Sequence, residues 1–471
     1  MLFNSFRFLF LFLPVVAAGY YICAHRISGR AGQIVLILSS LFFYGSARVA
    51  YVPLLACSIL FNFFLARVIA SAEGPWRKRL LVSALAANIA LLASFKYINF
   101  ALRSLSAFTR MQFSLPDWEF PLGISFFTLQ QVMYLVDCYE KLVPANDLWT
   151  HAAFASFFPC VISGPITRAR QMVPQLSQAV TTNAAKISQA LSLLAMGLFK
   201  KVALADSFSR IADAGFSHPA GLSALEAWSS SFAYTFQLYF DFSGYSDMAI
   251  ATALLLGFSL PVNFDTPYRS LSITEFWQRW HITLSQFITT YLYTPIVKSF
   301  KKATMAKASM ATLLAMTIAG LWHGPSWTFV LFGALHGFAL VVNQYWRKKV
   351  KRHVPRPLAW AATMLFVNFA FIFFRASNIA SALEICRDLW PNSHPWTLLV
   401  LKESIRMSEA AVIAIPLFIG LAAAFLGDNS NVISRRIQPR FSSAWAVAGL
   451  ILVSLLFMNS NLAKEFIYFA F

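Results

Sequence analysis

Two histidines that lie in apolar surroundings are the residues of this sequence best suited to chemistry. His323 stands in the stretch GLWHGPSW and is followed directly by Gly324 and Pro325. Because proline disfavours helical backbone at the residue before it, we expect a helix to end close to His323. A neutral imidazole can take a proton from a hydroxyl group near neutral pH, so His323 could act as a general base. A second interpretation stays open, in which His323 is a buried histidine hydrogen-bonded to a backbone carbonyl.

The second histidine, His281, lies in the stretch ITEFWQRWHITLSQF among charged and aromatic residues. It follows Trp277 by four residues and precedes Ser285 by four, so on one continuous helix the three side chains would share a face. Glu275 and Arg279 are also four residues apart and could form an ion pair, which would make both charges tolerable in an apolar setting. The stretch is either an interfacial helix anchored by tryptophans or one wall of a polar tunnel.

A further polar cluster interrupts an apolar window in the stretch QLYFDFSGYSDMAIA. It contains Asp241, Ser243, Tyr245 and Asp247. Ionisable groups at membrane depth are costly and therefore suggest a functional site. Asp241 and Asp247 are six residues apart and do not share a helical face well, which favours hydrogen bonding between helices over a shared metal ion. We predict no metal site, and we expect His336, thirteen residues after His323, to face elsewhere.

The elements that must position these residues are membrane helices. The chain has 471 residues, of which 58% are hydrophobic and 12% are charged, against about 25% charged residues in soluble domains. A spanning helix needs about 20 mostly apolar residues. Eleven stretches qualify: 6–24, 33–50, 52–70, 80–99, 120–138, 187–205, 309–322, 325–346, 357–374, 411–427 and 443–461. Strand patterning is absent.

The sequence therefore predicts an all-α polytopic membrane protein with about 11 transmembrane helices and additional re-entrant or interfacial helices. We expect one domain over residues 1–471, with a catalytic core at about 118–346.

The distribution of charge predicts how the chain lies in the membrane. The formal net charge is +19, and Lys and Arg gather in short loops at 67–79, 298–307, 347–356 and 435–440. The positive-inside rule places such loops in the cytoplasm, which puts the N-terminus outside. Basic loops also attract anionic lipids and an anionic cytoplasmic substrate. In a chain this apolar, the positive charge does not indicate binding to nucleic acid, and we expect none.

Seven segments of the chain resemble, in order, those of the membrane-bound O-acyltransferase (MBOAT) family, and most closely its bacterial alginate O-acetyltransferase-like branch. They are FPLGISFFTLQQVMYLVDCY, FFPCVISGPITR, GLFKKVALAD, QLYFDFSGYSDMAIATALLLGF, NFDTPYRSLSITEFWQRWHITLSQF, LWHGPSWTFVLFGALHGF and EFIYFAF. One such segment would be weakly specific, whereas seven in order over nearly the whole chain are specific. The resemblance implies a helical bundle with a polar tunnel, in which His323 is the catalytic general base and His281 is its companion.

The same resemblance implies the reaction and the partners. The expected reaction transfers an acyl group, acetyl in the first place, from a cytoplasmic thioester such as acetyl-CoA to a hydroxyl, with no bound cofactor. Such proteins lie in the bacterial inner membrane and pass acetyl to a partner acetyltransferase of the SGNH type, which modifies an extracytoplasmic polysaccharide. The residues expected to contact substrate are Asp241, Ser243, Tyr245, Asp247, Glu275, Trp277, Arg279, Trp280 and Trp322.

One segment departs from the family pattern. The alginate-type branch usually follows YLY with PLGGNR or a close variant, whereas here YLYTPIVKSFKKATMAK carries lysines instead. Since the histidine segments are intact, the departure concerns the donor-side surface, the partner contact or the polymer. Three alternatives stay open: D-alanyl transfer to teichoic acid, a transporter or flippase for a lipid-linked sugar, and an inactive scaffold. The crowding of polar groups into 237–336 argues against the transporter, which predicts polar groups in both halves.

Overall fold

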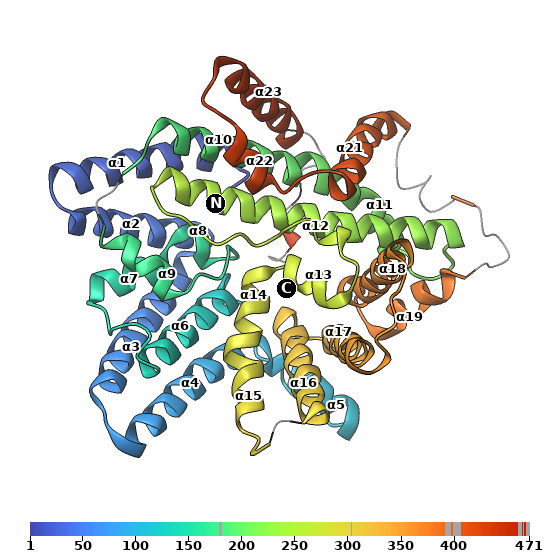
Figure 1. Ribbon diagram of the computed structural model, residues 1–471, viewed down its shortest axis with the longest axis horizontal. Coiled ribbons are helices and arrows are strands. Elements are labelled where there is room, and N and C mark those ends of the chain that lie inside the picture. Colours follow the sequence, from blue (N-terminus) through green and yellow to red (C-terminus); the bar gives the residue numbers. More distant parts are fainter. Residues whose placement is uncertain are drawn as a thin grey trace. The chain divides into compact units, whose positions relative to one another are not determined.

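The structure is a computed structural model of the chain. It describes residues 1–178, 181–302, 304–390, 397–398, 407–459, 464 and 466–467, with the backbone alone at 407–412. Every regular element in this part of the chain is a helix, which confirms the predicted all-α class (Figure 1).

The helices up to residue 217 are α1 (Leu13–Arg26), α2 (Gly29–Gly45), α3 (Val52–Ser71), α4 (Gly74–Lys96), α5 (Ile98–Thr109), α6 (Ile124–Tyr139), α7 (Leu148–Ser156), α8 (Phe158–Val161), α9 (Ala169–Leu176), α10 (Ala184–Phe199) and α11 (Asp206–Ser217). The later helices are α12 (Ala224–Leu255), α13 (Ile273–Arg279), α14 (Ile282–Phe287), α15 (Thr294–Lys298), α16 (Met305–His323), α17 (Trp327–Tyr345), α18 (Arg356–Arg375), α19 (Ile379–Asp388), α21 (Met407–Phe425), α22 (Ser430–Arg436) and α23 (Phe441–Met458). Short π- or 3-10-helical segments are η1 (Phe8–Phe12), η2 (Val49–Tyr51), η3 (Lys200–Ala205), η4 (Pro267–Arg269), η5 (Ile288–Tyr293) and η6 (Trp346–Val350).

Eight helices among the described residues are long and apolar enough to cross a membrane, or nine if the bent pair α21 and α22 forms one span. The eight correspond to eight of the eleven predicted stretches, and the pair contains a ninth. The two other stretches form α2 and α6, whose 17 and 16 residues are shorter than the roughly 20 that a full crossing needs. Helix α2 ends at Gly45, before the end of the stretch 33–50, and α6 begins only at Ile124, inside the stretch 120–138. The multi-pass membrane class is therefore confirmed.

The chain divides into two compact units, each assembled from discontinuous stretches. The first comprises Met1–Leu194, Ser246–Pro261 and Ser434–Ala444, and the second comprises Ala195–Tyr245, Val262–Ile433 and Trp445–Phe471. In the first unit, α3, α4 and α6 pack on one another (Figure 1). The Asn62 and Asn88 amides donate to each other across α3 and α4, at 3.1 and 2.8 Å, so neither buried amide is left without a partner.

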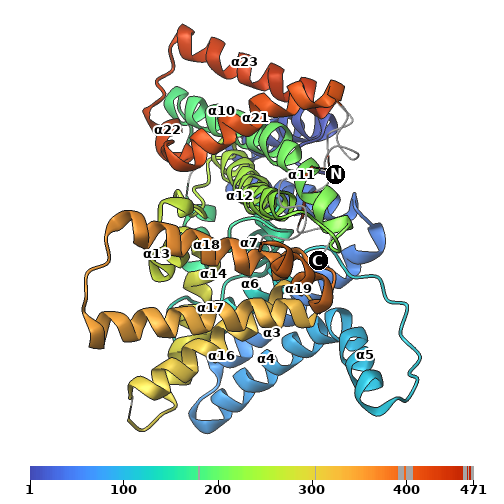
Figure 2. The same cartoon turned by 90° about the vertical axis from the view of Figure 1, so that its right-hand side faces the viewer.

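In the second unit, α16 and α17 form a tight helical hairpin, and α18 lies along α17 (Figure 2). Each helix of the hairpin begins at a hydroxyl cap: Thr304 accepts from Lys307 N at 3.3 Å, and Ser326 accepts from Thr328 N at 3.3 Å. This hairpin carries one of the two predicted catalytic histidines at its turn.

Candidate active site

His323 is the last residue of α16, where the helix breaks before Gly324 and Pro325. The prediction that a helix ends at this histidine is confirmed. The side chain is 5% exposed, and its ring centroid lies 5.1 Å from that of Trp322 and 5.2 Å from that of Phe374. The imidazole is thus presented by a helix end and surrounded by aromatic rings.

His281 does not lie on one helix with Trp277 and Ser285, so the prediction of a shared face is wrong. Helix α13 ends at Arg279, α14 begins at Ile282, and His281 between them has a φ of +42°. This left-handed conformation is uncommon for a residue other than glycine, and such strain often accompanies a functional site.

The turn at His281 is held by a segment that precedes it in the chain. Ile282 N donates to Asn263 O at 2.9 Å, and Asp265 N donates to Arg279 O at 2.9 Å. These two long-range backbone bonds compete successfully with continuation of the helix, because they satisfy groups that a helix end leaves free.

The side chain of Asn263 fixes the tautomer of His281. Thr283 donates to Asn263 Oδ1 from its backbone N–H at 3.3 Å and from its hydroxyl at 2.9 Å. The same oxygen lies 3.1 Å from His281 Nδ1. Because an amide oxygen only accepts, Nδ1 of the neutral ring carries the proton and Nε2 carries the lone pair. Nε2 is buried and has no hydrogen-bond partner among the described residues.

The two predicted histidines share one neighbour, Trp322. The ring centroid of His281 lies 6.5 Å from that of Trp322, which in turn lies 5.1 Å from that of His323. The His281 ring also packs edge to face against Phe242, with the ring centroids 4.7 Å apart. The structure therefore brings His281 and His323 into one buried aromatic cluster, although they come from different elements.

His336 occupies a different place, on α17. Its Nδ1 accepts a hydrogen bond from Trp277 Nε1 at 3.1 Å, which joins α17 to α13. Since the indole N–H only donates, Nδ1 is unprotonated and the proton of the neutral ring is on Nε2. Trp277 was expected to contact substrate, but its indole N–H is used in this hydrogen bond to His336. Trp280 packs face to face on Phe276, with centroids 5.5 Å apart.

Glu275 and Arg279 form the predicted ion pair, with Nε and Oε1 3.0 Å apart. Both side chains are about a third exposed. Arg279 also lies 3.7 Å from the Asp265 carboxylate and donates to Thr266 Oγ1 at 3.3 Å. In the structure these charges fasten α13 to the segment at 265–266.

Asp241 belongs to a buried ion cluster that the sequence interpretation missed. Lys201 Nζ lies 2.7 Å from Asp206 and 2.8 Å from Asp241, and all three side chains are 2–3% exposed. Two backbone N–H groups complete the cluster: Lys464 N donates to Asp206 at 3.1 Å and Ile467 N donates to Asp241 at 2.7 Å. A lysine within an apolar stretch was the available signal, because such cations are rare at membrane depth and usually have acidic partners.

The other polar residues of α12 that were expected to contact substrate do not gather at one place. Tyr245 stacks on Phe466, with centroids 4.3 Å apart and planes 15° apart. The Ser243 hydroxyl is buried and has no partner in the described part of the chain. Asp247 falls in the first compact unit, whereas Asp241, Ser243 and Tyr245 fall in the second. Among the described residues, no three His, Cys, Asp or Glu side chains converge as a metal site would require.

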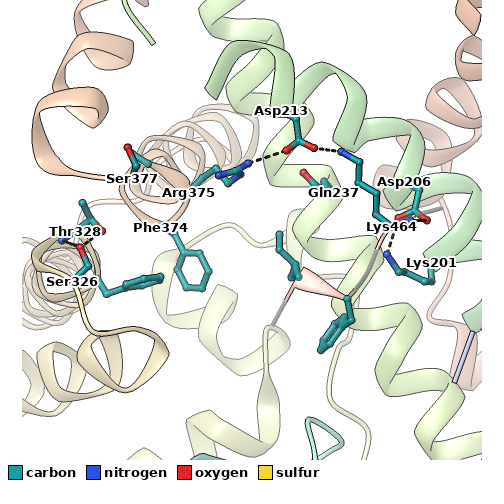
Figure 3. A pocket seen from close by; sticks show the side chains of 14 residues that line it. Lys201, Asp206, Asp213, Gln237, Ser326, Thr328, Phe374, Arg375, Ser377 and Lys464 are labelled. Carbon is teal, nitrogen blue, oxygen red and sulfur yellow. Dashed lines mark hydrogen bonds and ion pairs between the residues drawn. The ribbon is translucent and has the colours of Figure 1, made fainter. Parts of the chain in front are cut away.

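A polar pocket of about 560 Å³ adjoins this cluster (Figure 3). It is lined by Lys201, Asp206, Asp213, Gln237, Ser326, Thr328, Phe329, Phe374, Arg375, Ala376, Ser377, Lys464, Phe466 and Ile467. Asp213 binds both Arg375, at 2.9 Å, and Lys464. Gln237 Oε1 is buried there without a partner among the described residues. Phe374 contacts the His323 ring, so the pocket reaches the immediate surroundings of that histidine.

The chain is similar in sequence to one family of acyltransferases and to several bacterial members of it. Residues 80–384 match MBOAT, the membrane-bound O-acyltransferase family. The chain is 40% identical over 421 residues to a peptidoglycan O-acetyltransferase of Helicobacter pylori, covering 83% of this chain and 80% of that protein. It is 36% identical over 405 residues to a probable alginate O-acetylase of Azotobacter vinelandii, covering 84% and 79%. A teichoic acid D-alanyltransferase of Streptococcus thermophilus is 30% identical over 246 residues, covering 49% and 58%. The chain therefore belongs to the membrane-bound O-acyltransferase family and is a multi-pass O-acyltransferase.

Proposed function

We propose that this protein transfers an acetyl group from a cytoplasmic thioester, acetyl-CoA in the first place, for the O-acetylation of an extracytoplasmic polysaccharide. The observation that carries the proposal is the buried cluster of His281, Trp322 and His323, in which His281 Nε2 is an available hydrogen-bond acceptor. Both histidines lie inside the stretch that matches the family. The relatives that cover most of the chain are O-acetyltransferases, which favours acetyl as the group transferred.

The transfer step assigns one role to each histidine. Neutral His323 takes the proton from the acceptor hydroxyl as its oxygen attacks the thioester carbonyl carbon. The tetrahedral intermediate collapses, the C–S bond breaks, and the thiolate takes the proton back from His323, which leaves an O-ester and a free thiol. His281 Nε2 has no hydrogen, so it cannot donate to an oxyanion; it can accept from a second hydroxyl of the acceptor, next to the one that reacts, and so orient the acceptor.

The placement of charge supports entry of the two substrates from opposite sides. The basic loop at 298–307 precedes α16, and the basic segment 347–356 joins α17 to α18. If both are cytoplasmic by the positive-inside rule, the α16–α17 turn and the end of α18 point to the other side. These two places supply Ser326, Thr328, Arg375 and Ser377 to the polar pocket. The pocket would then receive the acceptor, and the basic residues at 298–307 and 347–356 would attract the phosphates of the donor.

A partner of the SGNH type completes the proposal, in the bacterial inner membrane. A single chain of membrane helices offers little surface to hold a long polymer, so a separate acetyltransferase on the outside would carry the acetyl group to it. Deleting a neighbouring SGNH-type gene should abolish polysaccharide O-acetylation while the membrane protein remains present. Unchanged acetylation in that deletion would sink the relay.

The D-alanyltransferase relative gives a second candidate, D-alanyl transfer to teichoic acid. It matches about half of this chain, against more than four fifths for the O-acetyltransferases. Ester-linked D-alanine, measured in the same cell-surface material, separates the two reactions.

The test is the O-acetyl content of purified surface polysaccharide in cells that carry His323→Ala, at matched amounts of membrane protein. Removal of a general base should lower the transfer rate by about 100-fold or more. His281→Ala should lower it less, because it removes an orienting contact. His218→Ala, directly after α11 and outside the cluster, is the control and should leave acetylation unchanged. Full acetylation in His323→Ala would indicate a scaffold role instead.

A further inference from the structure

An apolar groove lies at the second compact unit, between α17, α18 and the start of α13. Its volume is about 450 Å³. It is lined by Leu271, Ser272, Ile273, Phe338, Ala339, Val342, Asn343, Trp346, Val354, Ala359, Ala362, Thr363 and Phe366. None of these residues belongs to the cluster of His281 and His323 or to the polar pocket beside it.

The few polar side chains in the groove already have partners. Ser272 Oγ accepts from Glu275 N at 3.2 Å, at the start of α13. Asn343 Oδ1 accepts from Thr274 Oγ1 at 2.7 Å, and Thr363 Oγ1 donates to Ala359 O at 2.8 Å. A peptide strand or a sugar would have to leave its own polar groups without partners here, which is costly. The groove therefore suits a hydrocarbon chain.

A dense cluster of positive charge stands at one end of this groove. The segment 347–356 contains Arg347, Lys348, Lys349, Lys351, Arg352 and Arg356. Trp346 and Val354, which bracket most of it, both line the groove. Trp346 Nε1 donates to Arg352 O at 3.0 Å, so the segment folds back toward the groove instead of extending away. In the part of the chain that the structure describes, none of these six cations forms an ion pair.

We propose that this groove binds one anionic phospholipid of the cytoplasmic leaflet. One acyl chain would lie along Phe338, Ala339, Val342, Ala362 and Phe366, and the phosphate would lie at the basic segment 347–356. The combination of an apolar groove with uncompensated cations at its end favours this occupant, because the cations attract an anionic headgroup and a zwitterionic lipid gains little from them. The half-exposed Trp346 ring is suited to the headgroup boundary.

The site also touches the frame of the active site. The Phe366 ring lies 5.3 Å from that of His336, and His336 accepts the hydrogen bond of Trp277 on α13. A lipid in the groove would pack against Phe366 and so support its ring contact with His336. Retention of a lipid by the folded protein depends neither on the acyl group that is transferred nor on its acceptor.

The experiment measures which phospholipid stays on the full-length protein after purification from membranes of defined composition. Protein in nanodiscs of equal phosphatidylglycerol and phosphatidylcholine is extracted in mild detergent, and the retained lipid is identified by native mass spectrometry. We expect one phosphatidylglycerol per chain. Lys348→Gln/Lys349→Gln/Arg352→Gln should lower the ratio of retained phosphatidylglycerol to phosphatidylcholine about tenfold or more.

Matched controls separate this site from general attraction to a basic surface. Lys298→Gln/Lys301→Gln/Lys302→Gln removes the same charge from another loop and should leave the ratio unchanged. Ala339→Phe and Ala362→Phe fill the groove from opposite walls without altering its charge, and either should abolish retention. Equal retention of the two lipids by the wild type, equal loss in both charge variants, or full retention in both filled variants would each overturn the proposal.

Discussion

At the scale of single residues, the candidate site depends on how His281 is held. Its backbone is in the left-handed region, and its ring is oriented by the Asn263 amide oxygen at 3.1 Å. Thr283 fixes that amide from two directions. Asn263 acts through His281 and is therefore a positioning residue, comparable to the groups that set the tautomer of a catalytic histidine.

Replacement of Asn263 tests this arrangement. Asn263→Ala removes the acceptor of the Nδ1 proton, so the ring can adopt the other tautomer and turn its lone pair away. We expect acetyl transfer to fall by about tenfold or more, measured as O-acetyl content at equal protein level. Asn263→Asp keeps an acceptor oxygen and should restore part of the activity. Equal losses in the two variants would point to a purely structural role.

The position of His323 depends on its neighbours in sequence. The Gly-Pro pair that follows it ends α16 locally, so its place at a helix end was predictable from adjacent residues. Trp322 is its neighbour in sequence, but Phe332 and Phe374, whose rings also contact His323, come from other helices and were not predictable.

At the scale of elements, the α16–α17 hairpin depends on two glycines that let the helices approach closely. A Cβ at Gly320 would lie 2.3 Å from Phe329 O and 2.7 Å from Gly333 Cα. A Cβ at Gly333 would lie 2.3 Å from Met316 O. The obstructing atoms are backbone atoms, which cannot rotate away, so small residues at this crossing are a packing requirement.

Gly320→Ala and Gly333→Ala should each force the hairpin apart. We expect a loss of about 1–3 kcal/mol, typical of overpacking, and a lower thermal unfolding midpoint in detergent. Gly449→Ala on α23 is the matched control, because no atom of the described residues lies within 4 Å of its Cβ position. Its midpoint should stay the same or rise slightly. Midpoints for Gly320→Ala and Gly333→Ala equal to that of Gly449→Ala would contradict the close crossing.

Asp147 caps α7 in the first compact unit and offers a pH-dependent test. Its carboxylate accepts from Trp149 N and Thr150 N and pairs with Arg30. Burial pushes the pKa of Asp147 upward, but the hydrogen bonds from Thr150 and Arg30 outweigh it and hold the pKa below its ordinary value. The stabilisation is therefore complete above the unfolded pKa of about 3.9 and is lost as pH falls through the folded pKa.

Two substitutions at Asp147 separate the cap from the charge. Asp147→Ala should cost about 1 kcal/mol near neutral pH, since it removes the cap. Asp147→Asn keeps the backbone cap but loses the exposed ion pair and the hydrogen bond that Oδ2 accepts from the Thr150 hydroxyl at 2.7 Å, so it should cost less than Asp147→Ala. The difference between wild type and Asp147→Asn should shrink when unfolding is measured below about pH 4. A constant difference across pH would show that the charge is not its cause.

At the scale of the whole molecule, the buried ion cluster joins parts of the sequence that are far apart. Lys201 comes from η3, Asp241 from α12, and the N–H groups of Lys464 and Ile467 from the C-terminal segment. Each charge is compensated only when all of these parts are in place. Removing one partner of such a cluster is costly, because it leaves the other charges buried.

Lys201→Met should therefore destabilise the protein by about 3–5 kcal/mol and lower its amount in membranes. Lys186→Met, an exposed lysine at the start of α10, is the control and should have little effect. Unfolding midpoints in detergent compare the two. A further change of Asp206 to Asn in the Lys201→Met background should recover part of the loss, because it removes one uncompensated charge. No recovery would mean that packing, not charge, caused the loss.

The sequence alone determined the class of this protein, since the all-α membrane architecture follows from the length and spacing of apolar stretches. It also determined local features: the helix end at His323 and the ion pair of Glu275 with Arg279. These depend on neighbours within a few residues, whose interactions periodicity and proline chemistry describe. The ordered motifs also indicated the family, and the match of residues 80–384 to the family confirms it.

The tertiary structure alone decided the arrangement around the histidines. The sequence pattern of 272–287 favours one continuous helix, whereas backbone hydrogen bonds to Asn263 and Asp265 turn the chain at His281. Likewise, Asp241 has no local partner, and Lys201 reaches it only when separate helices pack. Such contacts depend on burial and on the packing of elements that are remote in sequence. Their free energies are larger than differences in local helix propensity, and residue spacing within one segment does not reveal them.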